Sequence, residues 1–323
     1  DNVESRGLGD VYKRQVYDRY DRVGGLLIYG IPGFKLEKHV VQRRHKLLED
    51  GGVTFRLNCD IGTNISFDEI REAHDAVLVA TGVYKARDIS APGIGMGGIV
   101  PALDYLTASN RKSLGDEVAD FDSGLLNAEG RDVVVIGGGD TAMDCVRTAI
   151  RQKANSVTCL YRRDRANMPG SQREVANAEE EGVDFRWLSA PQAFLGDNHV
   201  RAVQAQKIHL GQPDATGRQV PQIIEDSSHE IPADLVIKAL GFDPEDISTM
   251  FGTPELEVSK WGTIGVDWRT MMTNLPGVFA AGDIVRGASL VVWGVRDGRD
   301  AAESIHSYIM SQSEVPRVAA AGA

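Results

Sequence analysis

The feature that most constrains this chain is a glycine-rich turn that directly follows an apolar strand. Residues 133–142 read VVVIGGGDTA, a G-x-G-x-x-A pattern between a predicted buried strand and a predicted helix. Gly137 allows a tight turn, Gly139 lets the backbone approach a pyrophosphate, and the small Ala142 lets helix and strand pack closely. An ordinary glycine turn is the alternative. Because strand and helix are both in register, the pattern favours a dinucleotide whose pyrophosphate binds at the helix N-terminus.

The residues that follow the next predicted strand indicate which dinucleotide this site takes. About 20 residues beyond the glycines, an NAD site usually carries an Asp or Glu that bonds the ribose 2′-hydroxyl. Here the residue 20 positions after Ala142 is Arg162, followed by Arg163, within the stretch LYRRDR at 160–165. A guanidinium group suits a 2′-phosphate and would leave the NAD hydroxyl without its usual acceptor. A solvated basic turn is the alternative, but the spacing favours NADP.

A second signal is an acidic residue at the end of a predicted strand near the start of the chain. Asp18 ends the strand Val16–Asp18, six residues before the pair Gly24-Gly25. In a dinucleotide fold, an acid at the end of the second strand bonds the adenosine ribose. We expect the first strand and its glycine turn to be missing. The stretch Gly7-Leu8-Gly9 cannot be this turn, because no apolar strand precedes it and only six residues separate Gly9 from Val16. A crossover connection needs about ten or more.

A third signal lies near the end of the chain, where residues 278–283 read VFAAGD. This is an apolar strand that ends in Gly-Asp, and a helix is predicted from about Leu290. The carboxylate of Asp283 can accept hydrogen bonds from a ribitol hydroxyl, and the helix N-terminus can stabilise an anion such as the N1–C2=O region of a reduced flavin. A capped strand–helix junction is the alternative, but the half-site at Asp18 favours a flavin.

Short buried strands alternate with predicted helices, which is typical of parallel sheets in α/β proteins. Residues 75–82 and 234–241 share the pattern D-x-V-x-x-A-x-G, and each copy follows one of the two candidate dinucleotide units. The polar stretch 107–130 is expected to be a linker into the second unit. Residues 200–209 and 219–225 are expected to form antiparallel strands, as inserts in such domains often do.

Composition excludes several functions. The 323 residues carry 35 Lys and Arg against 46 Asp and Glu, a formal net charge of −11, which argues against nucleic acid as the main partner. No apolar run approaches the ~20 residues of a membrane span, so we expect a soluble, cytoplasmic protein without a membrane partner. Cys59, Cys145 and Cys159 include no C-x-x-C pair, which predicts reduced thiols and no metal site or complete iron–sulfur ligand set in this chain.

Four stretches of the chain together resemble one known family. They are GGLLIYGIPGFKLEK (24–38), VVVIGGGDTAMDC (133–145), YRRDRANMPGSQREV (161–175) and VFAAGDIVRGASLVVWGVRDGRDAA (278–302). In them the chain resembles the small (β) subunit of NADPH-dependent glutamate synthase, within the two-dinucleotide-binding flavoprotein family. The likeness runs from Val16 to about Met310, and the last two stretches are specific to this family and its nearest relatives.

The resemblance implies FAD at the first site and NADPH at the second. Hydride would pass directly from nicotinamide to flavin N5, so no catalytic side chain and no metal ligand are implied. Electrons would leave singly through iron–sulfur clusters to a large subunit that forms glutamate from 2-oxoglutarate and glutamine-derived ammonia. The residues implied at FAD are Asp18, Gly24, Gly25, Leu26, Thr81, Gly82, Gly282, Asp283, Ser289, Leu290 and Val291. Those implied at NADPH are Gly137, Gly139, Asp140, Thr141, Ala142, Arg162 and Arg163.

The implied fold class is α/β, with two Rossmann-like dinucleotide-binding domains that contain parallel sheets. The FAD-binding domain would be split, at about 16–105 and 250–323, and would lack its first βα unit, while the NADPH-binding domain would span about 106–249. Residues 1–15 match nothing in the family and are interpreted as an unrelated or artefactual leader on an N-terminally truncated chain. The chain also has Ile28 where relatives commonly have Arg.

Two alternative functions stay open. The chain could be the electron-input subunit of a dihydropyrimidine dehydrogenase or of another NADPH:acceptor oxidoreductase, since the FAD and NADPH motifs hardly separate these. It could also be an inactive fragment, because the missing βα unit would remove most contacts to the FAD pyrophosphate.

Overall fold

The computed structural model describes residues 13–213 and 219–313, and the chain divides into two compact units. Unit 1 contains the residues up to 21, 53–85 and those from 242 onward, and unit 2 contains 22–52 and 86–241. Strands β4 (Lys85–Ala86) and β14 (Phe242–Asp243) lie where the chain crosses between the units. The unit that carries Asp18 is therefore discontinuous. Its bounds differ from those expected for the FAD-binding domain, because residues 22–52 and 86–105 belong to unit 2.

Unit 2 contains a five-stranded sheet in the order β5-β13-β6-β7-β8, and each neighbouring pair is parallel. The strands are β5 (Ile99–Pro101), β13 (Leu235–Lys238), β6 (Asp132–Ile136), β7 (Ser156–Leu160) and β8 (Asp184–Arg186). Strands β7 and β8 lie to one side of β6, and β13 and β5 lie to the other. The carboxyl ends of β6 and β13 thus flank the point where the strand order reverses, which is where ligands bind in open α/β sheets.

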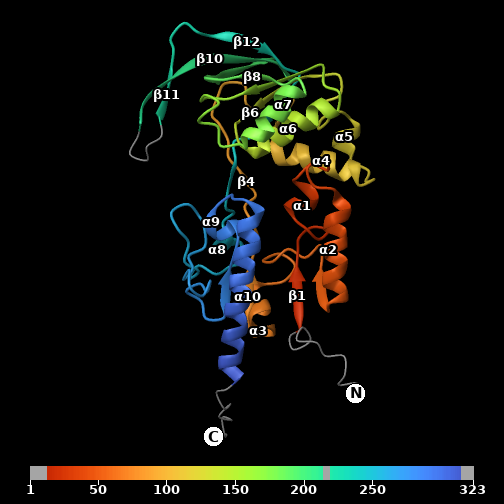
Figure 1. Ribbon diagram of the computed structural model, residues 1–323, viewed down its shortest axis with the longest axis vertical. Helices are drawn as coiled ribbons and strands as arrows, with labels where there is room; N and C mark the ends of the chain where they lie inside the picture. The colour runs from red at the N-terminus through yellow and green to blue at the C-terminus, as the bar shows by residue number, and fades with distance from the viewer. Residues whose placement is uncertain (1–12, 214–218, 314–323) are drawn as a thin grey trace. The chain divides into compact units, whose positions relative to one another are not determined.

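The two faces of this sheet are covered by different layers, as Figure 1 shows. Val133 and Val135 of β6 pack with the helices of one face. Val134 and Ile136 pack with an antiparallel sheet on the other. The helices are α4 (Ala102–Ser113), α6 (Asp140–Arg151) and α7 (Gln172–Glu180). Because both faces are covered, β6 is apolar from Val133 to Ile136, as parallel strands usually are.

The covering sheet confirms the predicted antiparallel insert. Its strands are β9 (Ser189–Gly196), β10 (Val200–Pro213), β11 (Gln219–Ile223) and β12 (His229–Pro232). β10 pairs antiparallel with each of the other three. Residues 214–218, between β10 and β11, lie outside the described residues.

The stretch 107–130 is not the linker that its polar composition predicts. It contains most of α4 and the short helix α5 (Ala119–Asp122). Ala108, Leu126 and Ala128 of this stretch are buried in the core of unit 2. The prediction is wrong because one face of α4 is apolar while the other is polar, so the average composition hides a packed helix.

The remaining part of unit 2 is the segment 22–52. It contains the short helix α1 (Leu26–Tyr29) and helix α2 (Lys38–Asp50). Ile28 is 1% exposed, so an apolar residue suits the position where relatives commonly have Arg.

Unit 1 contains two pairs of parallel strands, β1-β2 and β3-β15. The strands are β1 (Arg14–Tyr17), β2 (Val53–Arg56), β3 (Val77–Val79) and β15 (Val278–Ala280). The helices are α3 (Phe67–Ala73), α8 (Ile247–Met250), α9 (Asp283–Arg286) and α10 (Val291–Ser313). The core includes Phe67, Val79 and Val278.

The N-terminal leader is only partly visible. Residues 1–12 lie outside the described residues. Strand β1 begins at Arg14, so it extends two residues into the stretch interpreted as an unrelated leader. The internal repeat is confirmed as structure: β3 and β13 are both parallel strands, followed by Gly82 and Gly241 with φ of 73° and 91°.

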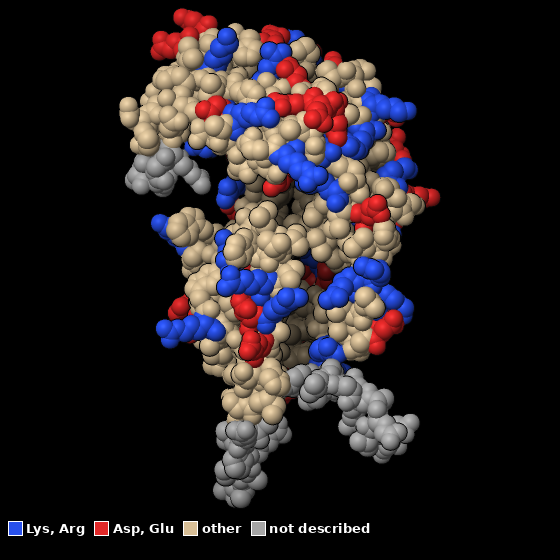
Figure 2. All heavy atoms as spheres, in the orientation of Figure 1, with Lys and Arg blue, Asp and Glu red and all other residues tan. Residues whose placement is uncertain are grey.

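Lys and Arg are interspersed with Asp and Glu on the face drawn in Figure 2. Cys145 and Cys159 are buried free thiols, and Cys59 is a half-buried one. Among the described residues, no helix is long and apolar enough to cross a bilayer.

Candidate dinucleotide sites

The glycine turn of unit 2 joins β6 to α6 with no room for a side chain at its first position. Gly137 has a φ of 147°, and a Cβ placed there would lie 2.1 Å from the carbonyl oxygen of Ala239. Ala239 follows β13, so this contact brings the glycine turn against the neighbouring strand at the switch point. Ala142 is fully buried between helix and sheet. Gly137 and Ala142 therefore have the roles that the motif predicts.

The N-terminus of α6 is open to a ligand. Gly139 is its N-cap, with extended backbone and no side-chain cap, and nothing lies within 4 Å of a Cβ built on it. Within the described part of the chain, the amide groups of Gly139, Asp140 and Thr141 have no hydrogen-bond acceptor. Such amides carry the positive end of the helix dipole, so the site can bind an anion.

The loop after β7 folds back over the glycine turn. A Cβ on Gly138 would lie 2.4 Å from the ring of Tyr161, so this ring packs directly on the turn. The amide of Gly170 donates to the carbonyl of Gly138 at 2.9 Å, and the amide of Ser171 donates to the carboxylate of Asp140 at 3.0 Å. Sequence reasoning missed these three partners. The only local signal is the Pro169-Gly170 dipeptide, which marks a turn but not what the turn covers.

The arginines that follow β7 differ in how they are paired. The side chain of Arg162 is exposed and has no ion pair or hydrogen bond to any described residue. Arg163 donates weakly to the carbonyl of Gln219 at 3.4 Å, whereas Arg165 forms a 2.8 Å ion pair with Glu179. Arg162 is thus the member of this cluster whose guanidinium is available to an incoming anion.

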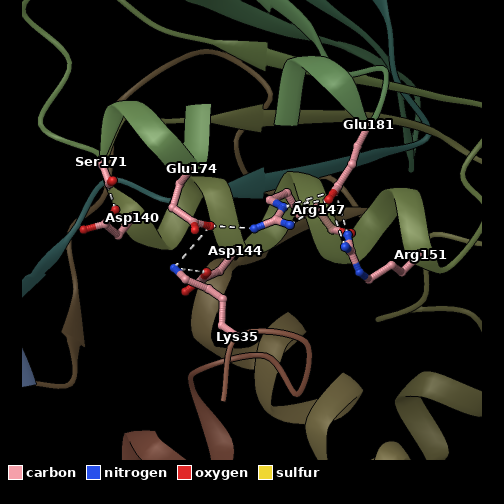
Figure 3. A network of polar contacts seen from close by, with 8 residues as sticks. All are labelled: Lys35, Asp140, Asp144, Arg147, Arg151, Ser171, Glu174 and Glu181. Carbon is pink, nitrogen blue, oxygen red and sulfur yellow. Dashed lines mark hydrogen bonds and ion pairs between the residues drawn. The ribbon is translucent and has the colours of Figure 1, made fainter. Parts of the chain in front are cut away.

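A chain of ion pairs lies along α6, as Figure 3 shows. Lys35 contacts Asp144 at 2.7 Å and Glu174 at 3.7 Å. Arg147 contacts Glu174 and Glu181, each at 2.7 Å. Burial raises the pKa of Asp144 to about 6, against the opposing effect of Lys35. Sequence reasoning missed this network, because its members come from separate elements.

The charge of Glu181 is stabilised by two guanidinium groups. Arg151 donates to its two carboxylate oxygens at 2.7 and 2.9 Å, and Arg147 donates to it as well. Hydrogen bonds from Arg151 and then Arg147 lower the pKa of Glu181 to about 2. Glu181 is therefore ionised at neutral pH and pairs with both guanidinium groups as a carboxylate.

In unit 1, Asp18 directly follows β1, as predicted. Its backbone amide donates to the carbonyl of Arg56, which continues the β1-β2 pairing. Its carboxylate accepts a 2.9 Å hydrogen bond from the amide of Tyr20. Burial raises the pKa of Asp18 above its ordinary value, and the hydrogen bond from Tyr20 opposes this. A partly desolvated carboxylate at a strand end is a good acceptor for a sugar hydroxyl.

The Gly-Asp pair after β15 also lies where the sequence predicts it. Gly282 has a φ of 78° and is the N-cap of α9. The Ser289 hydroxyl donates to the Asp283 carboxylate at 2.8 Å, so the structure brings together two predicted site residues. Burial raises the pKa of Asp283, while the bond from Ser289 opposes the shift. Leu290 and Val291, at the start of α10, are 60% and 51% exposed.

The predicted FAD residues are divided between the two units. Gly24, Gly25 and Leu26 belong to unit 2. A Cβ on Gly24 would lie 2.7 Å from the Val41 side chain, and Gly25 is the N-cap of α1 with a φ of 50°. The others belong to unit 1: Asp18, Thr81, Gly82, Gly282, Asp283, Ser289, Leu290 and Val291. All predicted NADPH residues belong to unit 2.

Comparison with known proteins defines the class. Residues 38–298 match the family model described as pyridine nucleotide-disulphide oxidoreductase, and the chain belongs to this family. The structure is similar to that of Mycobacterium tuberculosis FprA in complex with NADPH, with a TM-score of 0.75 and 18% identity over 93% of this chain and 78% of that one. This likeness confirms the α/β fold class with two Rossmann-like units.

The sequence is more closely similar to particular members. It is 67% identical to the glutamate synthase [NADPH] small chain of Azospirillum brasilense, over 96% of this chain and 64% of that one. It is also 67% identical to a provisionally named small chain from Cereibacter sphaeroides, over 93% of this chain and 72% of that one. Within the family, this chain therefore belongs to the small chains of NADPH-dependent glutamate synthase. It spans just under two thirds of the length of the Azospirillum relative.

Proposed function

We propose that this chain binds NADPH in unit 2, binds FAD chiefly through unit 1, and oxidises NADPH as part of a glutamate synthase. The observation that carries the proposal is the anion site at the N-terminus of α6. Three amide groups without acceptors among the described residues follow a glycine turn that tolerates no side chain at Gly137. The similarity to glutamate synthase small chains supports the same assignment.

At the NADPH site, the residues of this chain bind and orient the coenzyme. The amides of Gly139, Asp140 and Thr141 would bind the pyrophosphate. Arg162 would bind the 2′-phosphate, because its guanidinium has no partner among the described residues and lies two positions beyond the end of β7. Arg163 would add a second positive charge. NADPH would thus be preferred over NADH by charge rather than by shape.

At the FAD site, the carboxylates of Asp18 and Asp283 would accept hydrogen bonds from hydroxyl groups of the cofactor. Asp18 would bind the adenosine ribose and Asp283 the ribitol. The exposed Leu290 and Val291 offer an apolar surface for an aromatic ring, and the first amides of α10 would face its polar edge. When bound, NADPH supplies a hydride, and FAD accepts it and releases the electrons one at a time.

The wider role follows from the relatives. We infer that the electrons pass through iron–sulfur clusters to a large chain, which forms glutamate from glutamine and 2-oxoglutarate. The relatives that support this inference are named as small chains of NADPH-dependent glutamate synthase. On this proposal, the NADPH site is formed by the parallel sheet of unit 2, helix α6 and the loop after β7.

The test is flavin reduction. The purified chain is incubated with FAD, freed of unbound flavin, and mixed anaerobically with NADPH while flavin absorbance is followed in a stopped-flow instrument. We expect a stoichiometric flavin peak that NADPH bleaches faster than NADH does. Bound flavin that NADPH does not bleach would overturn the proposal. A chain that retains no flavin would favour the inactive-fragment alternative.

A further inference from the structure

The stretch 22–38, here called the docking segment, is attached to the rest of unit 2 by one buried hydrogen bond and one partly buried ion pair. The amide of Asn110, a buried side chain of α4, donates to the carbonyl of Tyr29 at 2.8 Å. Arg22 donates to both carboxylate oxygens of Asp116 at 2.6 and 2.7 Å. The segment carries the glycine pair assigned to FAD, yet its contacts are with the unit assigned to NADPH.

Lys35 connects the docking segment to α6, as Figure 3 shows. Its ammonium group lies 2.7 Å from Asp144 and 3.7 Å from Glu174. The side chains of Lys35, Asp144 and Glu174 are 24%, 10% and 16% exposed, so all three are largely shielded from solvent. The neighbouring Phe34 ring lies 3.9 Å from the guanidinium of Arg151. Removing one partner of such a shielded pair leaves the other charge poorly solvated, so the loss of either Lys35 or Asp144 should be destabilising.

The position of Asp144 on α6 gives this contact its significance. Asp144 lies four residues after Asp140, so the two are one turn apart on the same face, about 6 Å along the axis. The first turn of α6 is the anion site. A pyrophosphate bound there would order this turn and add negative charge near the Lys35 ammonium, and both effects would strengthen the hold of α6 on Lys35.

We propose that Lys35 is a positioning residue through which occupancy of the NADPH site orders the docking segment and its flavin-binding glycines. The inference rests on the proposed function, since it takes the anion site of α6 to be the NADPH site. Coupling between two sites is reciprocal, so flavin bound at the glycine pair would tighten NADPH binding by the same factor.

Hydrogen exchange of the whole chain, with NADP⁺ as the probe, tests this coupling. The amides of residues 27–31 donate to the carbonyls of Gly24, Gly25 and Leu26, so their exchange reports opening of the segment. We expect saturating NADP⁺ to slow their exchange about fivefold, at the lower end of ordinary coupling. The Lys35→Met variant should lose this slowing, and Lys35→Arg should retain most of it, because a guanidinium can still pair with Asp144.

The matched control is Lys46→Met, which removes the exposed Lys46–Asp50 pair on α2 and should leave the slowing intact. Titration calorimetry with NADP⁺ on the same samples separates the two proposals. No binding of NADP⁺ to the parent chain would overturn the proposed function and this inference with it. Binding without slower exchange in residues 27–31, or full slowing in Lys35→Met, would overturn the inference alone. Asp144→Asn gives a second variant if Lys35→Met does not fold.

Discussion

The parallel strands of the two units are covered to very different degrees. In unit 2, the five-stranded sheet has helices on one face and an antiparallel sheet on the other, and every residue of β6 after Asp132 is buried. In unit 1, the parallel strands form two separate pairs, and Val16 and Leu78 are 41% and 39% exposed on them. The anion site of unit 2 is therefore built from tightly packed backbone. The candidate site of unit 1 depends more on side chains at strand ends.

The same contrast extends to the charged groups. In unit 2, Asp144, Glu174 and Glu181 are paired with Lys35, Arg147 and Arg151. In unit 1, the carboxylates of Asp18 and Asp283 are bonded to an amide and a hydroxyl rather than to a cation. The pKa of each is accordingly raised by burial. Unit 1 thus presents carboxylates that suit neutral hydroxyl partners.

The largest expected effect compares one glycine from each unit. Gly137→Ala should lower the free energy of unfolding of unit 2 by about 3 kcal/mol or more, because its Cβ would clash with the Ala239 carbonyl. Gly282→Ala in unit 1 should cost only about 1 kcal/mol, since its φ is positive but no described atom lies closer than 4.0 Å to the new Cβ. Urea unfolding measures both. Equal losses would contradict the contrast in packing.

The next effect concerns the arginines of unit 2. Arg162→Gln should raise the Kd for NADP⁺ roughly tenfold to a hundredfold, the usual worth of a hydrogen bond to a charged group. The Kd for NAD⁺ should change little. Arg165→Gln is the matched control, because that guanidinium is already paired with Glu179. Titration calorimetry gives all the values, and an equal loss of affinity for the two coenzymes would refute the role of Arg162 at the 2′-phosphate.

The smallest effect is a difference in pH dependence between carboxylates of the two units. The pKa of Glu181 is lowered to about 2, so its contribution to stability is present above its ordinary value of 4.5 and is lost as pH falls toward 2. Glu181→Gln should cost about 1–2 kcal/mol at pH 7, after allowance for screening, and this cost should disappear as pH falls through about 2. The pKa of Asp283 is raised, so Asp283→Asn should not destabilise unit 1 at pH 7 and should match the parent below pH 3.8.

Thermal unfolding followed between pH 2 and pH 7 measures both variants. At neutral pH, Glu181→Gln should have a lower Tm than the parent chain, and Asp283→Asn should not. A loss of stability in Asp283→Asn that grows as pH rises would contradict the assignment of its raised pKa to burial.

Sequence patterns predicted those parts of the fold whose signals are local. The strand 132–136 and the helix up to Arg151 are confirmed, because an apolar run, a glycine turn and a helical period lie within twenty residues of one another. Helix α4 was not predicted, because most of it lies in the polar stretch 107–130. Its burial depends on Tyr105 and Leu106 packing against α6, which is distant in sequence, and no local pattern reports such a partner.

By itself, the sequence determined the glycine turn, the arginines beyond it and the carboxylates at two strand ends. Backbone sterics and charge restrict those positions within a few residues, so the residue types alone report them. Only the tertiary structure decided that Lys35 pairs with Asp144, 109 residues away, and that Gly170 and Ser171 close over the turn. Such contacts depend on how distant elements pack, since a side chain gains its partner only after the chain has brought them together.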